Sequence, residues 1–125
     1  MQDPIRSITL PTIDHGDITI PCPPWCAGHD TTPQYRADLT HEGTERILSI
    51  PTKHGPVALL VVAFEQRPYA ENWPGTAPFV NVGFGGDYHP MRRPALHAAA
   101  DALMDQAAVL RRLADELGEL LGGDQ

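Results

Sequence analysis

The first apolar positions of the chain alternate with polar ones in two short runs, a pattern typical of β-strands. The runs cover residues 5–10 and 17–20, and both are rich in β-branched side chains. Polar turn residues that end in Gly16 lie between them. The pattern predicts a β-hairpin over residues 5–20.

A second pair of apolar runs covers residues 45–50 and 57–66, joined by a connection that holds two prolines and a glycine. Eight consecutive positions of the second run, residues 57–64, are apolar. Because alternate side chains of a strand point to opposite faces, we expect a central strand with cover on both faces. Residues 79–84 predict a further strand, which places the main sheet within residues 45–84.

From residue 94 onward the apolar residues recur in steps of three and four, which is the period of an α-helix. Strong helix formers fill the other positions, Pro94 suits the first turn, and two glycines follow the run. We expect one long helix over residues 94–121, packed across a face of the sheet. The fold class is α+β, with about five or six antiparallel strands, in a single domain of residues 1–125.

The apolar stripe of this helix is the strongest periodic signal in the chain. Its length of about 42 Å is twice the ~20 Å of a six-residue strand, so part of the helix should overhang the sheet. Either the overhanging end frays or curls over loops, with a break at Gly118, or it meets a second copy. We favour a homodimer through the C-terminal helix, with contacts at Leu110, Leu113, Leu117 and Leu120. The whole stripe comprises Leu96, Ala99 or Ala100, Leu103, Ala107, Leu110, Ala114, Leu117 and Leu121.

Composition and charge narrow the class of protein. The 125 residues carry a net charge of −7 and few basic side chains. Because proteins bind phosphate backbones mainly through clustered Lys and Arg, this composition argues against a nucleic-acid-binding role. The candidate for a local basic patch is the adjacent pair Arg92 and Arg93. No apolar run approaches the ~20 residues of a membrane span, and no signal peptide is visible at the amino terminus, so we expect a cytoplasmic protein.

The candidate chemistry lies in residues 21–41, which hold both cysteines and two histidines. Cys22, Cys26, His29 and His41 follow the spacing C-x3-C-x2-H-x11-H, in which two thiolates can reach one ion across a tight turn. Mixed sulfur and nitrogen ligands in a tetrahedral set favour Zn²⁺ over iron. Prolines make the segment irregular up to an expected half-buried strand over residues 35–41, so it should form a zinc-knuckle-like insertion.

The cysteine pair could also serve three roles that need no metal. A redox pair of the thioredoxin kind has two intervening residues rather than three, which argues against it. A disulfide would close only a short loop and suits an oxidising compartment, and two merely packed thiols are a further alternative. The fourth ligand is also open, because His15 or Asp38 could replace His41.

Four protein ligands fill the coordination sphere of zinc and leave no position for water, which indicates a structural site. We therefore expect a small zinc-binding interaction or regulatory module with an unidentified protein partner and no catalysis. The first alternative is a zinc enzyme in which His41 faces elsewhere and Asp30 or Asp38 acts as acid or base. The second is a nucleic-acid-binding accessory protein. The role of the loop with Tyr69 and Trp73 stays open.

The motif Cys-Pro-x-Trp-Cys, followed by a His, an aromatic residue and a second His before a Gly, resembles the hallmark of a family. It is a family of small, uncharacterised actinobacterial proteins, a domain of unknown function. The resemblance extends over the upstream hairpin and the alanine- and leucine-rich helix. It implies a metal site at the cysteines and histidines and no established activity.

Overall fold

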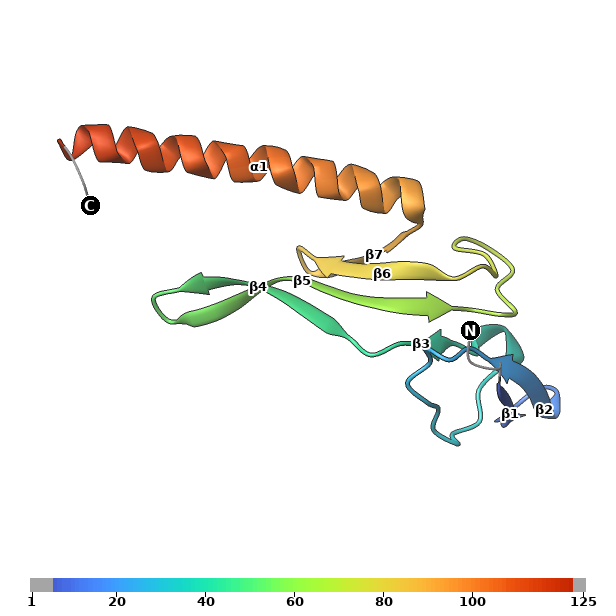
Figure 1. The fold of residues 1–125 in the computed structure, drawn as a ribbon. Coiled ribbons are helices and arrows are strands. Elements are labelled where there is room, and N and C mark those ends of the chain that lie inside the picture. The colour runs from blue at the N-terminus through green and yellow to red at the C-terminus, as the bar shows by residue number, and fades with distance from the viewer. Residues whose placement is uncertain (1–5, 123–125) are drawn as a thin grey trace. The chain divides into compact units, whose positions relative to one another are not determined.

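The computed structural model describes residues 6–122, and it divides between Met91 and Arg92 into two units. The first unit holds the strands and a short 3₁₀ turn, and the second is a single helix (Figure 1). The elements in chain order are β1 (Arg6–Thr12), β2 (Gly16–Cys22), η1 (Arg36–Asp38), β3 (His41–Glu42), β4 (Arg46–Thr52), β5 (Gly55–Gln66), β6 (Phe79–Phe84), β7 (Asp87–Met91) and α1 (Arg93–Leu120).

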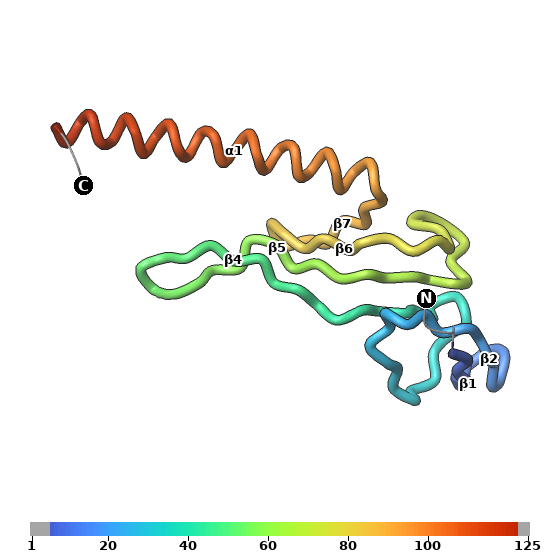
Figure 2. The backbone as a smooth tube through the Cα atoms, viewed as in Figure 1, coloured from blue at the N-terminus to red at the C-terminus, as the bar shows by residue number. Residues whose placement is uncertain are grey.

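The strands form two antiparallel sheets rather than one, and the α+β class expected from the sequence is confirmed. β1 and β2 make a two-stranded sheet. In the five-stranded sheet, β5 is central: β3 and β4 pair with successive parts of one edge, and β6 followed by β7 lies on the other edge. The backbone trace shows β5 and β6 running side by side (Figure 2).

The expected N-terminal hairpin is present, although residue 5, where it was expected to begin, lies outside the described residues. Its strands are longer than the sequence pattern indicated, and β2 continues to Cys22, the first candidate metal ligand. The turn depends on Gly16, whose φ of 64° suits glycine. Leu10 and Ile20 of the hairpin form a small core with Leu39, against which Ile8, Ile18 and Tyr69 pack.

The prediction of a strand over residues 35–41 is wrong. Residues 36–38 form η1, where the Asp38 and Leu39 amides donate to the carbonyls of Tyr35 and Arg36 at 2.9 and 3.2 Å. The Arg36 amide donates to the Asp14 carboxylate at 3.0 Å. These local bonds satisfy the backbone without a partner strand, so the apolar Leu39 packs into the core from a turn.

Strand β7 was missed in the sequence pattern. It contains Pro90 and few apolar residues, which suits an edge strand, where a missing amide donor costs no sheet bond. Gly85 and Gly86, with φ of 62° and 85°, form the two-residue turn from β6. The two adjacent glycines were the signal that could have revealed this hairpin.

Strand β5 is twelve residues long and occupies the central position that its apolar run predicted, but none of residues 57–64 is buried, so the expected cover on both faces is not observed. At ~3.3 Å per residue it spans about 40 Å, so a helix of about 42 Å does not outrun it, and the two lengths give no reason to expect an overhang. All seven residues of β4 are exposed, Ile47 by 60%. The β4–β5 hairpin therefore carries apolar side chains that the first unit does not bury.

The second unit is the helix α1, whose observed bounds differ by one residue at each end from those expected. Pro94 lies in its first turn, Gly122 follows its end with a φ of 77°, and Gly118 does not interrupt it. Its packing across a face of the sheet stays a prediction, as does the single-domain organisation. Within residues 6–122, no helix is both long enough and apolar enough to cross a membrane.

Candidate metal centre

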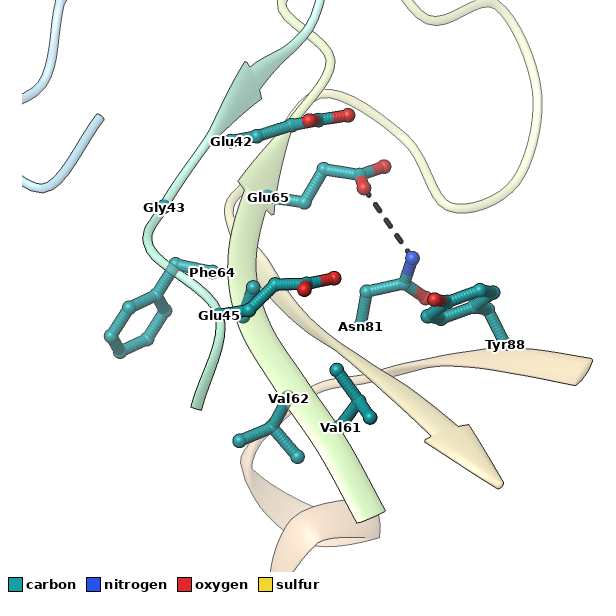
Figure 3. Close-up of a pocket in the computed structure, with 10 residues that line it drawn as sticks. Glu42, Gly43, Glu45, Val61, Val62, Phe64, Glu65, Asn81 and Tyr88 are labelled. Carbon is teal, nitrogen blue, oxygen red and sulfur yellow. Dashed lines mark hydrogen bonds between the residues drawn. The ribbon is translucent and has the colours of Figure 1, made fainter. Parts of the chain in front are cut away.

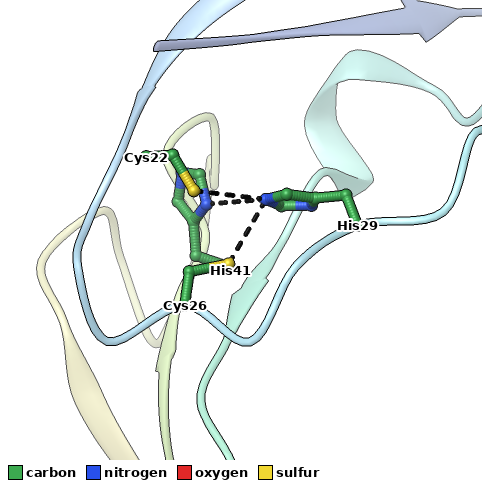
Figure 4. Close-up of side chains that lie close together, drawn as sticks. All are labelled: Cys22, Cys26, His29 and His41. Carbon is green, nitrogen blue, oxygen red and sulfur yellow. Dashed lines mark hydrogen bonds between the residues drawn. The ribbon is translucent and has the colours of Figure 1, made fainter. Parts of the chain in front are cut away.

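The four candidate ligands come from three separate parts of the first unit (Figure 4). Cys22 is the last residue of β2, and His41 is the first residue of β3. Cys26 and His29 lie on the loop between these strands, and Cys26 forms an isolated antiparallel bridge with Gly43. The fold therefore joins the two-stranded sheet, the loop and the five-stranded sheet at one point.

The side chains of these residues converge on a common centre. His29 Nε2 lies 3.3 Å from Cys26 Sγ, 3.7 Å from Cys22 Sγ and 3.2 Å from His41 Nδ1. All four ligand atoms lie within 4.8 Å of one another, and among residues 6–122 this is the only such group of Cys, His, Asp and Glu that could hold a metal ion. Both cysteines are free thiols.

Hydrogen bonding alone does not account for this convergence. A ring nitrogen offers either one hydrogen or one lone pair in the plane of the ring, so it serves one good partner. His29 Nε2 faces three heteroatoms at once (Figure 4). Such crowding of potential ligand atoms is what a bound cation would organise, and the residues are positioned to hold a metal ion.

The centre is shielded from water on most sides. His41 is 2% exposed, Cys22 4% and Cys26 7%, while His29 is only partly buried. Burial raises the pKa of Cys22, and the neighbouring Cys26 raises it further. Burial also lowers the pKa of His41, assisted by the nearby His29. The metal-free site therefore favours a neutral imidazole, which is ready to bind, and a thiol that must release its proton on binding.

Backbone contacts hold the cysteine loop in place. The Cys26 amide donates to the Pro23 carbonyl at 3.1 Å and closes a tight turn, and the Ala27 amide donates to Glu42 of β3 at 2.8 Å. The Pro21 carbonyl, near the His41 ring, works against the lowering of the His41 pKa by burial. The loop conformation is therefore set by the same strands that supply Cys22 and His41.

Trp25 anchors the middle of the loop on the five-stranded sheet. Its ring lies 5.8 Å from that of Phe64 in β5. A side chain at Gly43 would come within 3.3 Å of the Trp25 carbonyl, so a small residue there lets the loop approach the sheet closely. Trp25, between the two cysteines, thus contributes packing that holds the loop against β5.

The alternative ligands named from the sequence lie elsewhere. His15 pairs with Asp14 in the β1–β2 turn, with Nδ1 3.1 Å from the carboxylate. Asp30 accepts a hydrogen bond from the Thr32 amide at 3.0 Å. Asp30 and Asp38 line a cavity of about 180 Å³ that also touches His29. Neither His15 nor Asp38 belongs to the converging group, which contains His41 instead.

A second cavity, of about 230 Å³, lies on one face of the five-stranded sheet (Figure 3). Glu42, Glu45 and Glu65 reach toward it, together with Asn81. Glu65 is 7% exposed, but its carboxylate accepts hydrogen bonds from Arg67 Nε at 2.8 Å and Asn81 Nδ2 at 3.4 Å. The buried charge is thus already paired, and the cavity presents no buried group that requires a ligand.

The aromatic residues of the loop between β5 and β6 differ in their surroundings. Tyr69 packs against the small core of the N-terminal hairpin, and the guanidinium of Arg36 lies 5.1 Å from its ring centroid. Trp73 is 69% exposed. Tyr69 therefore fixes the loop against the core, while Trp73 is largely exposed to solvent.

Comparison with known proteins identifies a family for this chain but no activity. Neither curated proteins nor solved structures gave a match. A family model described as Domain of unknown function (DUF6907) matches residues 7–119, which include the metal centre, both sheets and nearly all of α1. The chain therefore belongs to this family of unknown function.

Proposed function

We propose that this protein is a small zinc-binding interaction or regulatory module in which a structural Zn²⁺ holds the N-terminal region together. The observation that carries the proposal is the convergence of two thiols and two imidazoles, within 4.8 Å of one another, from three parts of the fold. Zinc is the metal for which this donor set is most typical.

The distances between the donor atoms fit tetrahedral zinc. Bonds of ~2.3 Å to sulfur and ~2.0–2.1 Å to nitrogen place a sulfur and a nitrogen ligand ~3.6 Å apart and two nitrogens ~3.3 Å apart. The sulfur–nitrogen separations of 3.3 and 3.7 Å and the nitrogen–nitrogen separation of 3.2 Å lie close to these values. These three distances all start at His29 Nε2, and the complete set of donor atoms lies within 4.8 Å, so binding would draw its widest pairs closer together.

The position of the centre explains why such an ion would be structural. Cys22 ends the two-stranded sheet and His41 begins the five-stranded one, so zinc would tie both sheets to the loop between them. The apolar core beside it has only three buried members, Leu10, Ile20 and Leu39. Metal binding would supply folding free energy that so small a core cannot provide.

A closed centre also favours an interaction role over catalysis. Four protein ligands leave no open position for water or substrate. The rival is a zinc enzyme with three protein ligands, and the cavity beside His29, lined by Asp30 and Asp38, is the feature that favours it. The structural site and the zinc enzyme differ in the role of His41. It is a zinc ligand in the structural site and is not needed for zinc binding in the enzyme.

The proposal is tested by metal analysis of the untagged full chain and by thermal unfolding before and after removal of metal with a strong chelator. We expect about one zinc per chain and a large drop in the unfolding temperature after chelation, reversed by added Zn²⁺. Protein that contains no zinc, or that unfolds at the same temperature without it, would refute a structural zinc site.

His41→Ala separates the closed site from the open one. Loss of a fourth ligand should weaken zinc retention and lower the unfolding temperature, whereas His54→Ala, in the turn of the β4–β5 hairpin, should change neither. A His41→Ala protein that keeps zinc with unchanged affinity would support the three-ligand enzyme instead.

A further inference from the structure

Helix α1 carries an apolar surface that one helix cannot bury within itself. Leucines recur at seven-residue intervals at positions 96, 103, 110 and 117. Alanines recur at the same interval at positions 100, 107 and 114, four residues after the first three leucines, and Leu121 completes the series. A seven-residue repeat with spacings of four and three is the signature of a helix that packs along another helix.

We propose that α1 pairs with α1 of a second copy of this chain in an antiparallel, two-fold arrangement. A two-fold axis that passes between residues 108 and 109 of both helices brings each leucine of the repeat in this central part of one copy opposite an alanine of the other. Leu103 then lies opposite Ala114, Ala107 opposite Leu110, and Ala100 opposite Leu117, so a large side chain meets a small one at each of these levels. A parallel pair would instead stack leucine on leucine and alanine on alanine, leaving gaps at the alanine levels.

The charges of the helix favour the same orientation. Arg92 and Arg93 lie at its N-terminal end, and Asp115, Glu116 and Glu119 lie near its C-terminal end. Both groups oppose the dipole of their own helix, which favours acidic residues at the start and basic ones at the end. In the antiparallel register, Arg112 lies level with Asp105 of the second copy, although Asp101 lies level with Glu116. Opposite dipole ends meet at each end of the pair, whereas a parallel neighbour aligns like charges and like dipole ends.

The exposed apolar area is sufficient for a stable dimer. Seven large apolar side chains of the helix and its cap are between 42% and 84% exposed: Leu103, Met104, Leu110, Leu113, Leu117, Leu120 and Leu121. Burial of such a side chain removes on the order of 100 Å² of apolar surface from water. The four leucines of the repeat would bury ~800 Å² over both copies, and the flanking Met104, Leu113 and Leu120 would add part of their area, for a total of about 1,100 Å², which a specific interface requires.

Two adjacent alanines provide a matched test of the interface. Ala107 belongs to the repeat and is partly buried, while Ala108 is exposed and points away from the repeat. In sedimentation of the full chain over a dilution series, the unchanged protein and Ala108→Lys should dimerise, and Ala107→Lys should be monomeric. Circular dichroism checks that both variants keep their helix. A monomeric unchanged protein, or equal effects of the two substitutions, would overturn the proposal.

A photo-crosslinking residue at Leu120, which is 84% exposed, tests the orientation. Mass spectrometry of the crosslinked full chain should find bonds between two copies, within one turn of His97. Bonds between two copies near Leu120 itself would indicate a parallel pair, and bonds within one copy to the sheet would indicate that the chain covers its own helix. Either result overturns the antiparallel dimer. The proposal does not depend on zinc, so these outcomes are independent of the metal centre.

Discussion

The segment between Cys22 and His41 and the helix α1 both lack the apolar burial that usually holds a domain together, and they differ in what replaces it. Beside the first, three core residues are buried, together with three side chains that could bind a metal. In the second, large apolar side chains recur at regular intervals and remain exposed. One region is positioned to hold a metal ion, and the other leaves large apolar side chains exposed.

This contrast shows that burial and exposure both indicate function when they fall on unexpected residue types. Thiols and imidazoles lose favourable hydration when buried, so their concentration at one point indicates a ligand that compensates. Leucines gain from burial, so their regular exposure along a helix indicates a partner. The zinc ion and the helix partner proposed above each follow from residues whose burial or exposure is unusual for their type.

The largest expected effect comes from Cys22→Ser. Serine does not replace a zinc thiolate, and loss of a structural metal is among the few single changes that cost about 4 kcal/mol or more. By hydrogen exchange, protection should fall in β1, β2 and the loop up to His41, while β5 and β6 keep more of theirs. An equal loss across both sheets would show that the metal centre does not stabilise a local region.

Ser7→Ala is the matched control for this substitution, because it changes an exposed residue of the same two-stranded sheet that is not one of the converging side chains. It should leave zinc content and hydrogen exchange near those of the unchanged protein. If Ser7→Ala and Cys22→Ser were equally destabilising, strand pairing rather than metal binding would explain the effect.

A smaller change in stability should distinguish a buried leucine from an exposed one. Leu39→Ala removes a side chain that is 4% exposed and should cost about 2–4 kcal/mol of unfolding free energy, because it leaves a cavity in a three-residue core. Leu120→Ala removes one that is 84% exposed and should change monomer stability by less than about 0.5 kcal/mol. Chemical denaturation at low protein concentration, where dimers are absent, measures both.

The smallest effect concerns Asp14, which joins the β1–β2 turn to η1. The Arg36 amide that donates to its carboxylate, with help from His15, lowers the pKa of Asp14 below its ordinary value of 3.8. A lowered pKa in the folded state contributes stability above about pH 3.8 and loses it as the pH falls through the folded value. The effect is small because the group is exposed.

Asp14→Asn should therefore be slightly less stable than the unchanged protein at neutral pH, and the difference should shrink below about pH 3.8. Thermal unfolding of both proteins across this range gives the comparison, with zinc content measured at each pH so that only samples of equal metal content are compared. A difference that stays constant with pH would show that the carboxylate charge is not what matters.

Patterns within one element were sufficient to predict several features. The steps of three and four residues predicted α1 to within one residue at each end, and the apolar run of residues 57–64 predicted the central position of β5. Residue type and spacing were also sufficient to select Cys22, Cys26, His29 and His41, which the fold brings together. In each case the pattern lies within a short stretch of sequence. Its physical cause is the repeat of side-chain directions along a helix or strand, or the distance over which nearby ligands can reach one ion.

Features that depend on contacts between distant residues were not predictable in this way. The segment around Leu39 resembles a strand by alternation, yet a bond from Arg36 to Asp14, twenty-two residues away, accompanies the turn η1. β7 carries little apolar signal because it is an edge strand, and its place depends on pairing with β6. Division into two sheets follows from where the hairpins pair, which no single run of residues reveals.

The amino-acid sequence by itself determined the helix, the central strand and the identity of the converging ligands, because each depends on periodicity or on residue chemistry over a short stretch. Only the tertiary structure decided that Cys22 ends one sheet, that His41 begins another, and that both point at His29. The reason is that ligand geometry depends on the meeting of segments, and their meeting is set by strand pairing and packing over the whole unit.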